Sequence, residues 1–247
     1  MQYNIHSKFI STPITEIVAE AVDACSALGF GMAGQPLSEY VLQTTFLKMT
    51  GASEQKMKCL CWEMATRNFK YRYDYLSSNK NYGECSTYKA KNDVYKDLLG
   101  EIQDIDPSFK PDSVFDDKQK IIDDTKEQLY KILDNSVVGI WVRRGLLLSK
   151  TNSPLDFVRG DQLKLDDKNI FESSLAEYYN SIVYLHRNRC AHNLKSYQNN
   201  LPSLKTLEKN SYQFENYFYR YLILSLLDTI FIRLYTKYIA CLDESPE

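Results

Sequence analysis

The residues best suited to chemistry stand together at positions 187–192, which read Arg-Asn-Arg-Cys-Ala-His and are followed by Asn193. This block contains one of only three histidines in the chain. The guanidinium of Arg187 is always charged and suits bidentate contact with a phosphate or a carboxylate. His192 has an ordinary pKa close to neutrality, so it can accept and release protons at physiological pH. The block therefore combines an anion binder with a proton carrier.

Helical spacing would bring these groups to one end of a helix. Asn188 and His192 are four residues apart, so on a helix they share a face, which Arg189 flanks. Arg187 lies more than one turn before His192 and must reach across with its long side chain. The block has no carboxylate and no second histidine at ligand spacing. The pattern favours an anion site over a metal site, and we expect no cofactor.

An arginine and a histidine beside a phosphodiester suggest cleavage of RNA without a metal. The 2′-hydroxyl would be the nucleophile, His192 would carry the proton, and Arg187 would stabilise the developing negative charge. The need for a 2′-hydroxyl confines this activity to RNA. Arg189, Lys195 and Tyr197 are candidates to contact the substrate. One arginine and one histidine leave the opposite proton-transfer role unfilled, so the motif predicts a second copy facing it.

The string from Arg187 to His192, at a helix end in an all-α chain, resembles the HEPN superfamily of ribonucleases. The resemblance covers the motif and its helical surroundings, roughly residues 112–242. It implies an up-and-down helical bundle in which two copies meet and their motifs form one composite site. It also implies that Arg187 binds the scissile phosphate, that His192 transfers protons and that Asn188 positions the imidazole ring.

The same resemblance implies a biological setting and an additional residue. Proteins of this kind occur in prokaryotic toxin–antitoxin, abortive-infection and CRISPR-associated defence, so we expect an RNA substrate, a homodimer, and an antitoxin or sensor protein as a further partner. The family also has a variable acidic or polar helper on a neighbouring helix. The sequence does not assign this helper; Glu172 and Glu177 are the candidates considered.

Other interpretations of the motif stay open. Arg187 and Arg189 suit the negative C-terminal end of a helix dipole, and His192 then only terminates that helix. The chain can also be a helical module of the same fold without catalytic activity, which binds a partner protein or a nucleotide. A plain helical scaffold is the third possibility. The adjacent His186 is expected to pack or to face solvent.

The rest of the chain predicts one all-α domain spanning residues 1–247, with a HEPN-like core at about 112–242 and an N-terminal helical part at about 1–105. Glycine and proline are scarce, with nine and seven in 247 residues, and apolar residues recur at helical spacing. Residues 1–12 are expected to be extended or loosely packed. Helices are expected at about 13–28, 37–49, 54–76, 94–105, 113–148, 168–192 and 212–240.

Four details belong to this prediction. Thr12 caps the first helix, Thr50 and Gly51 close the second, Ser53 caps the third, and a kink falls at residues 135–136.

Two other stretches could have carried chemistry. The glycines in residues 29–34 do not follow a strand and lack a downstream GK[ST], so a hinge or turn is favoured over a phosphate-binding loop. Residues 67–75 interleave basic and aromatic side chains, which can bind single-stranded nucleic acid by stacking and phosphate contacts. An ordinary helix with packed tyrosines and solvated cations is the favoured interpretation of that tract.

Charge and hydropathy set outer limits on function. A net charge of −2 argues against a globally basic nucleic-acid binder but permits a local basic site. The apolar run at 217–242 is interrupted by Arg220, Asp228, Arg233 and Lys237, which predicts the central helix of a soluble bundle rather than a membrane span. No CxxC pair and no apolar leader are present, so a cytoplasmic protein with reduced thiols is expected.

Overall fold

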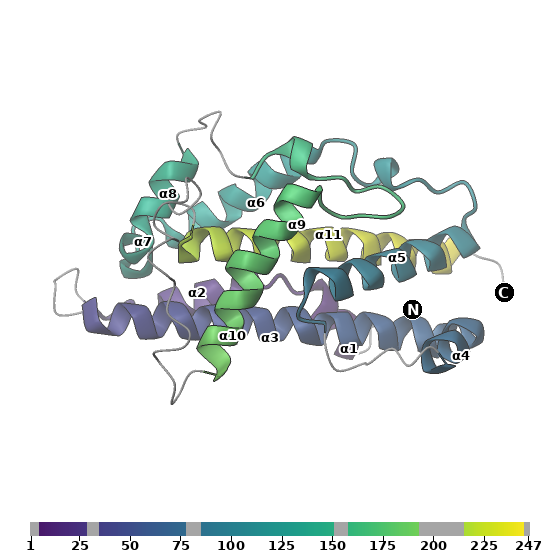
Figure 1. The fold of residues 1–247 in the computed structure, drawn as a ribbon, viewed down its shortest axis with the longest axis horizontal. Helices are drawn as coiled ribbons and strands as arrows, with labels where there is room; N and C mark the ends of the chain where they lie inside the picture. The colour runs from purple at the N-terminus through teal and green to yellow at the C-terminus, as the bar shows by residue number, and fades with distance from the viewer. Residues whose placement is uncertain (1–4, 29–34, 78–84, 151–157, 193–214, 245–247) are drawn as a thin grey trace.

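A computed structural model describes residues 5–28, 35–77, 85–150, 158–192 and 215–244 of the chain. These residues form a helical bundle, as Figure 1 shows, so the predicted all-α fold class is confirmed. The described part contains no β-strand, only an isolated antiparallel bridge between Leu163 and Phe171.

The bundle is built from α-helices, two short 3-10 helices and one π-helical turn. In chain order they are α1 (Ile5–Ser11), α2 (Thr15–Ala24), α3 (Gln35–Arg67), α4 (Phe69–Ser77), α5 (Tyr88–Ile105), η2 (Pro111–Ser113), α6 (Lys118–Leu133), α7 (Val137–Trp141), α8 (Arg143–Lys150), η3 (Gly160–Gln162), α9 (Ser173–Tyr178), the π-helical η4 (Tyr179–Tyr184), α10 (Leu185–His192) and α11 (Tyr217–Glu244).

Helix α11 forms the centre of the bundle. Its consecutive residues Leu222, Ile223 and Leu224 are each 0% exposed, so the helix is covered on every side. It packs against α3, α5 and α6, and Figure 1 shows it in yellow between α6 and α3. The predicted central helix is therefore confirmed. None of the described helices is long and apolar enough to cross a membrane.

A buried ion pair joins α11 to α3. The ammonium Nζ of Lys56 lies 2.6 Å from Oδ1 of Asp228, and the two side chains are 3% and 4% exposed. The N–H of Ile14 donates to Oδ2 of Asp228 at 2.8 Å, and Lys56 also donates to the carbonyl of Thr12. Burial lowers the pKa of Lys56 and raises the pKa of Asp228, because it disfavours both charged forms. Three segments of the chain thus meet at one buried pair.

Helix α3 is continuous across the position where two helices were expected, so that prediction is wrong. The hydroxyl of Thr50 donates to the carbonyl of Leu47 at 2.9 Å instead of closing the helix. Gly51 costs only about 1 kcal/mol within a helix, which tertiary packing readily offsets. Ser53 is buried and accepts a hydrogen bond from Nζ of Lys91 at 2.9 Å, so it does not cap a helix.

The helix end that was predicted at residues 50–51 lies at Asn68 instead. Its Oδ1 accepts from the N–H of Tyr71 at 3.2 Å, which caps the start of α4. Its Nδ2 donates to both carboxylate oxygens of Glu101 at 3.0 Å. The basic and aromatic tract at residues 67–75 therefore lies mostly on a short separate helix, α4, which packs beside the end of α3.

The N-terminal prediction is also wrong. Residues 5–11 form α1 rather than an extended segment, because Ile10 is 1% exposed and packs in the core. The hydroxyl of Thr12 donates to the carbonyl of Lys8 at 2.9 Å, so it closes α1 and does not cap α2. The glycines in residues 29–34 lie outside the described residues.

The other helix boundaries differ from the predicted ones mainly where a short polar side chain caps the helix. Three helices begin at a residue whose side chain accepts from the backbone N–H three positions on: Thr87 for α5 at 3.2 Å, Asp117 for α6 at 2.8 Å and Ser136 for α7 at 2.9 Å. Asn135 has a φ of 57°, which confirms the expected kink there. Helix α9 begins at Ser173 rather than near 168, because residues 163–171 form a turn closed by the isolated bridge.

Removing one member of the buried pair should destabilise the fold. Asp228→Leu or Lys56→Met alone leaves an uncompensated buried charge, which costs about 3–5 kcal/mol. The double variant removes both charges and should be more stable than either single variant. Urea unfolding at neutral pH measures all three. Single variants that unfold with the wild-type midpoint would contradict this role for the pair.

Candidate functional site

The motif lies at the end of a helix that runs without interruption through α9, η4 and α10. Helix α10 packs against α3, and Figure 1 shows the whole run in green crossing α3. A π-helical turn holds more residues than an α-helical turn, so η4 rotates the faces of α10. Leu185 is 46% exposed at the start of α10. The guanidinium Nε of Arg220 on α11 donates to the carbonyl of Ile182 within this turn at 3.3 Å.

His186 is partly buried and packs against aromatic side chains, which is one of its two expected placements. Its ring centroid lies 5.2 Å from that of Phe46 and 5.4 Å from that of Tyr217. Its Nε2 lies 3.2 Å from the hydroxyl of Tyr217, which itself donates to Oε1 of Glu39 at 2.8 Å. Because the tyrosine has only one hydrogen to give, we assign the imidazole proton to Nε2.

The surroundings of His186 keep its ring neutral. Burial, together with the nearby positive charges of Arg220 and Arg189, lowers its pKa to about 3. An imidazole with this pKa does not exchange protons at physiological pH. His186 is therefore a packing residue.

Arg187 is held by a carboxylate from another helix. Its Nη2 lies 3.3 Å from both oxygens of Glu54, which stands on α3, and its Nη1 donates to Oδ1 of Asn188 at 3.2 Å. The side chains of Arg187 and Glu54 are 27% and 16% exposed, so the pair is partly open to solvent. The geometry therefore joins two predicted site residues to an acidic side chain located 133 positions earlier in the sequence.

The two acidic candidates from the neighbouring sequence do not occupy this position. Glu172 precedes the first residue of α9, and Glu177 is exposed on that helix. Glu54 takes their place. It was missed because the acidic residues considered were close to the motif in sequence, whereas Glu54 is brought there by the crossing of α3 and α10.

A second cation, Lys91, lies near the pair of Arg187 and Glu54. Lys91 on α5 is 1% exposed and donates from Nζ to Oγ of Ser53. Burial lowers its pKa to about 8, while the nearby carboxylate of Glu54 opposes this shift. Glu54 therefore lies in the field of two cations, Lys91 and Arg187. The sequence did not single out Lys91.

The remaining predicted site residues are only partly described. Arg189 is partly exposed on α10. His192 is the last residue of α10, one turn after Asn188, and its side chain lies outside the described residues. Asn193, Lys195 and Tyr197 also lie outside them. Within the described part of the chain, no group of three or more His, Cys, Asp or Glu side chains could hold a metal ion.

No protein-family model, no curated protein and no solved structure matches this chain. The resemblance to the HEPN superfamily therefore depends on the residues from Arg187 to His192 and on their helical setting.

The burial of His186 predicts a specific pH dependence of stability. Its folded pKa of about 3 lies below the ordinary value of 6.5, so the unfolded chain binds the proton more readily between these values. As far as His186 is concerned, the free energy of unfolding has its full value above pH 6.5. It falls with decreasing pH below that value, by up to about 1.4 kcal/mol per pH unit. In His186→Gln this fall should be smaller. Urea unfolding at pH 7 and pH 5 measures it, and equal slopes in both proteins would refute the assignment.

Proposed function

We propose that this protein is a metal-independent RNA endonuclease of the HEPN type, acting as a homodimer. The observation that carries the proposal is the position of Arg187. Its guanidinium is partly exposed near a helix end and oriented by Glu54 and Asn188, and His192 follows five residues later as the last residue of α10. A guanidinium fixed in this way is prepared to bind a phosphate that arrives from solvent.

The reaction follows from these groups. The 2′-oxygen of one nucleotide attacks the adjacent phosphorus and loses its proton, and the bond to the 5′-oxygen of the next nucleotide breaks. Arg187 stabilises the negative charge that develops on the phosphate oxygens. His192 transfers a proton on one side of the phosphate, and Asn188 positions its ring. The products carry a 2′,3′-cyclic phosphate and a free 5′-hydroxyl.

Glu54 has a positioning role in this proposal. The carboxylate of Glu54 holds Nη2 and the amide oxygen of Asn188 holds Nη1, so together they orient the guanidinium. The negative charge of Glu54 also partly neutralises Arg187, whose full positive charge would attract any anion. Lys91, buried behind it, offsets the negative charge of Glu54 and keeps the site attractive to phosphate. The acidic helper expected from the resemblance is thus assigned to Glu54.

The proposal requires two copies of the chain. One arginine and one histidine leave either the proton acceptor or the proton donor missing, so the second motif supplies it. Such an enzyme would act in phage defence or in a toxin–antitoxin system, restrained by an antitoxin or triggered by a sensor partner.

One observation favours the alternative, a helical module without catalytic activity that binds a partner protein or a nucleotide. Arg187 already has two protein partners, Glu54 and Asn188, and this pairing by itself would stabilise the contact between α3 and α10. The two functions differ in whether the protein cleaves RNA, which a cleavage assay measures directly.

We expect the wild-type protein to cleave single-stranded RNA in the presence of EDTA and to leave 2′,3′-cyclic phosphate ends. Arg187→Ala and His192→Ala should each lower the rate at least 100-fold, since each removes a group that acts on the transition state. Glu54→Gln should have a smaller effect, because it disturbs orientation only. Gel analysis of a labelled RNA, with end-group mapping, gives both results.

Arg144→Ala is the matched control, since Arg144 is exposed on α8 and contacts none of the motif residues in the described structure. It should cleave at the wild-type rate. Undiminished cleavage by His192→Ala would exclude the proposed chemistry. Absence of cleavage by the wild type, with normal folding, would favour the binding module.

The composite site predicts inhibition by an inactive partner. Adding excess Arg187→Ala chain to wild-type protein should lower the activity per wild-type chain, because mixed dimers contain only one intact arginine. The same excess of Arg144→Ala should not lower it. Native mass measurements verify that mixed dimers form. If mixed dimers form and activity per wild-type chain is unchanged, each chain has its own complete site.

A further inference from the structure

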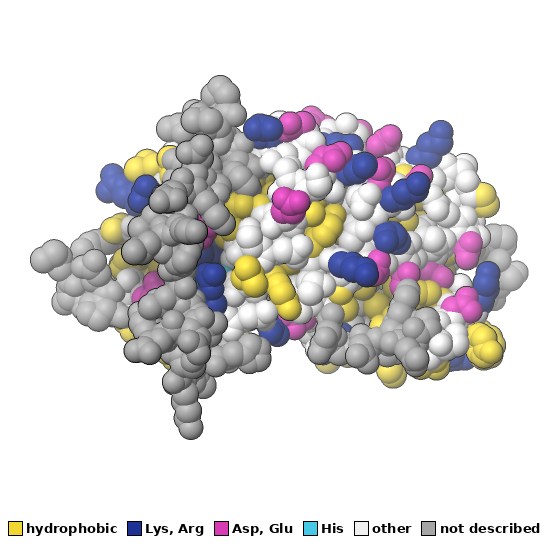
Figure 2. Space-filling model, viewed as in Figure 1, with side chains coloured by type: hydrophobic (Ala, Val, Ile, Leu, Met, Phe, Trp, Pro, Cys, Tyr) yellow, Lys and Arg dark blue, Asp and Glu magenta, His cyan; other side chains and the backbone are white. Residues whose placement is uncertain are grey.

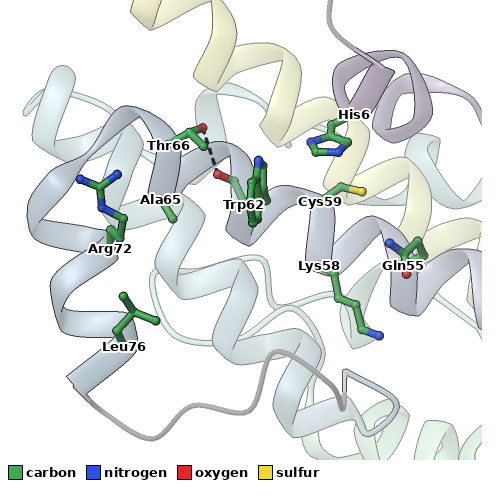
Figure 3. A pocket seen from close by; sticks show the side chains of 9 residues that line it. All are labelled: His6, Gln55, Lys58, Cys59, Trp62, Ala65, Thr66, Arg72 and Leu76. Atoms are coloured by element: carbon green, nitrogen blue, oxygen red, sulfur yellow. Dashed lines mark hydrogen bonds between the residues drawn. The ribbon is translucent and has the colours of Figure 1, made fainter.

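A second site candidate is a cavity of about 520 Å³ between α1, α3 and α4. Figure 3 shows Trp62 in its middle, with Arg72 and Leu76 on one side and Lys58 and Cys59 on the other. These residues come from two turns of α3 and from α4, the helix that holds the basic and aromatic tract. The cavity falls within the size range of small-molecule sites.

The cavity presents an aromatic surface to solvent. The side chain of Trp62 is 56% exposed, and Leu76 opposite it is 65% exposed, while Cys59 and Ala65 below are buried. The ring of His6 meets the indole edge-on at 6.2 Å and 88°, which limits its movement. An exposed indole beside apolar walls is a suitable platform for a planar ring.

The charges around the cavity are positive. Lys58 and Arg72 line it, and none of the described residues that line it has a carboxylate. Neither cation forms an ion pair with another described residue, and the guanidinium of Arg72 instead lies 5.0 Å from the ring centroid of Phe69. By contrast, the charge of the nearby Arg67 is neutralised by Glu63 at 3.1 Å. These two cations and the indole suit a ligand that is both planar and anionic.

We propose that this cavity binds one nucleotide of a single-stranded RNA, with the base stacked on Trp62 and the phosphates between Lys58 and Arg72. Stacking and phosphate contacts together are the usual means of binding single strands without sequence preference. An apolar peptide would leave both cations unused, which disfavours it as the occupant.

The position along α3 links this cavity to the candidate nuclease site. Lys58 follows Glu54 by one helical turn, and Trp62 follows Lys58 by another, so Trp62 lies about 12 Å along the helix from Glu54. A strand bound at Trp62 can therefore continue towards Arg187. This part of the proposal rests on the proposed nuclease function, whereas nucleotide binding in the cavity does not.

The test uses the fluorescence of Trp62. The chain has two tryptophans, so Trp141→Phe leaves Trp62 as the only reporter. The probe is an oligoadenylate hexamer with 2′-O-methyl groups, which cannot be cleaved through its 2′-oxygen. We expect saturable quenching of Trp62 by this hexamer, and clearly weaker quenching by AMP or by inorganic phosphate.

Variants then test the residues by fluorescence anisotropy of the labelled hexamer. Trp62→Ala should weaken binding about 5- to 150-fold, as expected for the loss of one stacked base. Replacing Lys58 and Arg72 by glutamine should weaken binding and reduce its dependence on salt. Tyr40→Ala is the control, because Tyr40 is an aromatic residue of α3 with 67% exposure and no role in the cavity. It should bind like the wild type.

The outcomes separate this inference from the proposed function. Binding that is unchanged in Trp62→Ala overturns the inference, even if the protein cleaves RNA. AMP that binds as tightly as the hexamer overturns the assignment to an RNA strand and indicates a site for free nucleotides. Quenching and loss of binding in Trp62→Ala support the inference even if no cleavage is found, in which case only the nuclease proposal fails.

Discussion

The contact between Lys56 and Asp228 fixes the arrangement on which the candidate site depends. Both groups are buried, so each needs the other as a partner, and their contact joins α3 to α11 at this position. Glu54 stands two residues before Lys56 on α3, so this contact helps to set where its carboxylate lies. Asp228 also accepts from the N–H of Ile14, so the start of the chain is fixed by the same pair.

A second contact positions the motif of residues 187–192 beside Glu54. The π-helical turn η4 precedes α10, and Arg220 of α11 donates to a carbonyl within it. His186, neutral and packed against Phe46, then anchors the first turn of α10 on α3. As a result, Arg187 lies beside a carboxylate instead of pointing freely into solvent. The central helix therefore positions both halves of the site, one through a charge pair and the other through a backbone contact.

Helical periodicity was enough to predict the class of fold and the central helix, because burial on all sides requires apolar residues on all sides. It was not enough to place helix ends. Thr50 and Gly51 looked like an end and lie within α3, whereas Asn68 ends it through hydrogen bonds to Tyr71 and to Glu101. A short polar side chain can cap a helix or pack inside it, and only its distant partners decide between the two.

The sequence by itself determined the chemistry that is available, namely a guanidinium, an amide and an imidazole at helical spacing from Arg187 to His192. Spacing along one helix is a local property, so it can be read from consecutive residues. Only the tertiary structure decided that Glu54 is the acidic partner and that Trp62 lines a cavity with Lys58 and Arg72. These contacts join residues on different helices, and their geometry follows from the packing of α3 against the rest of the bundle.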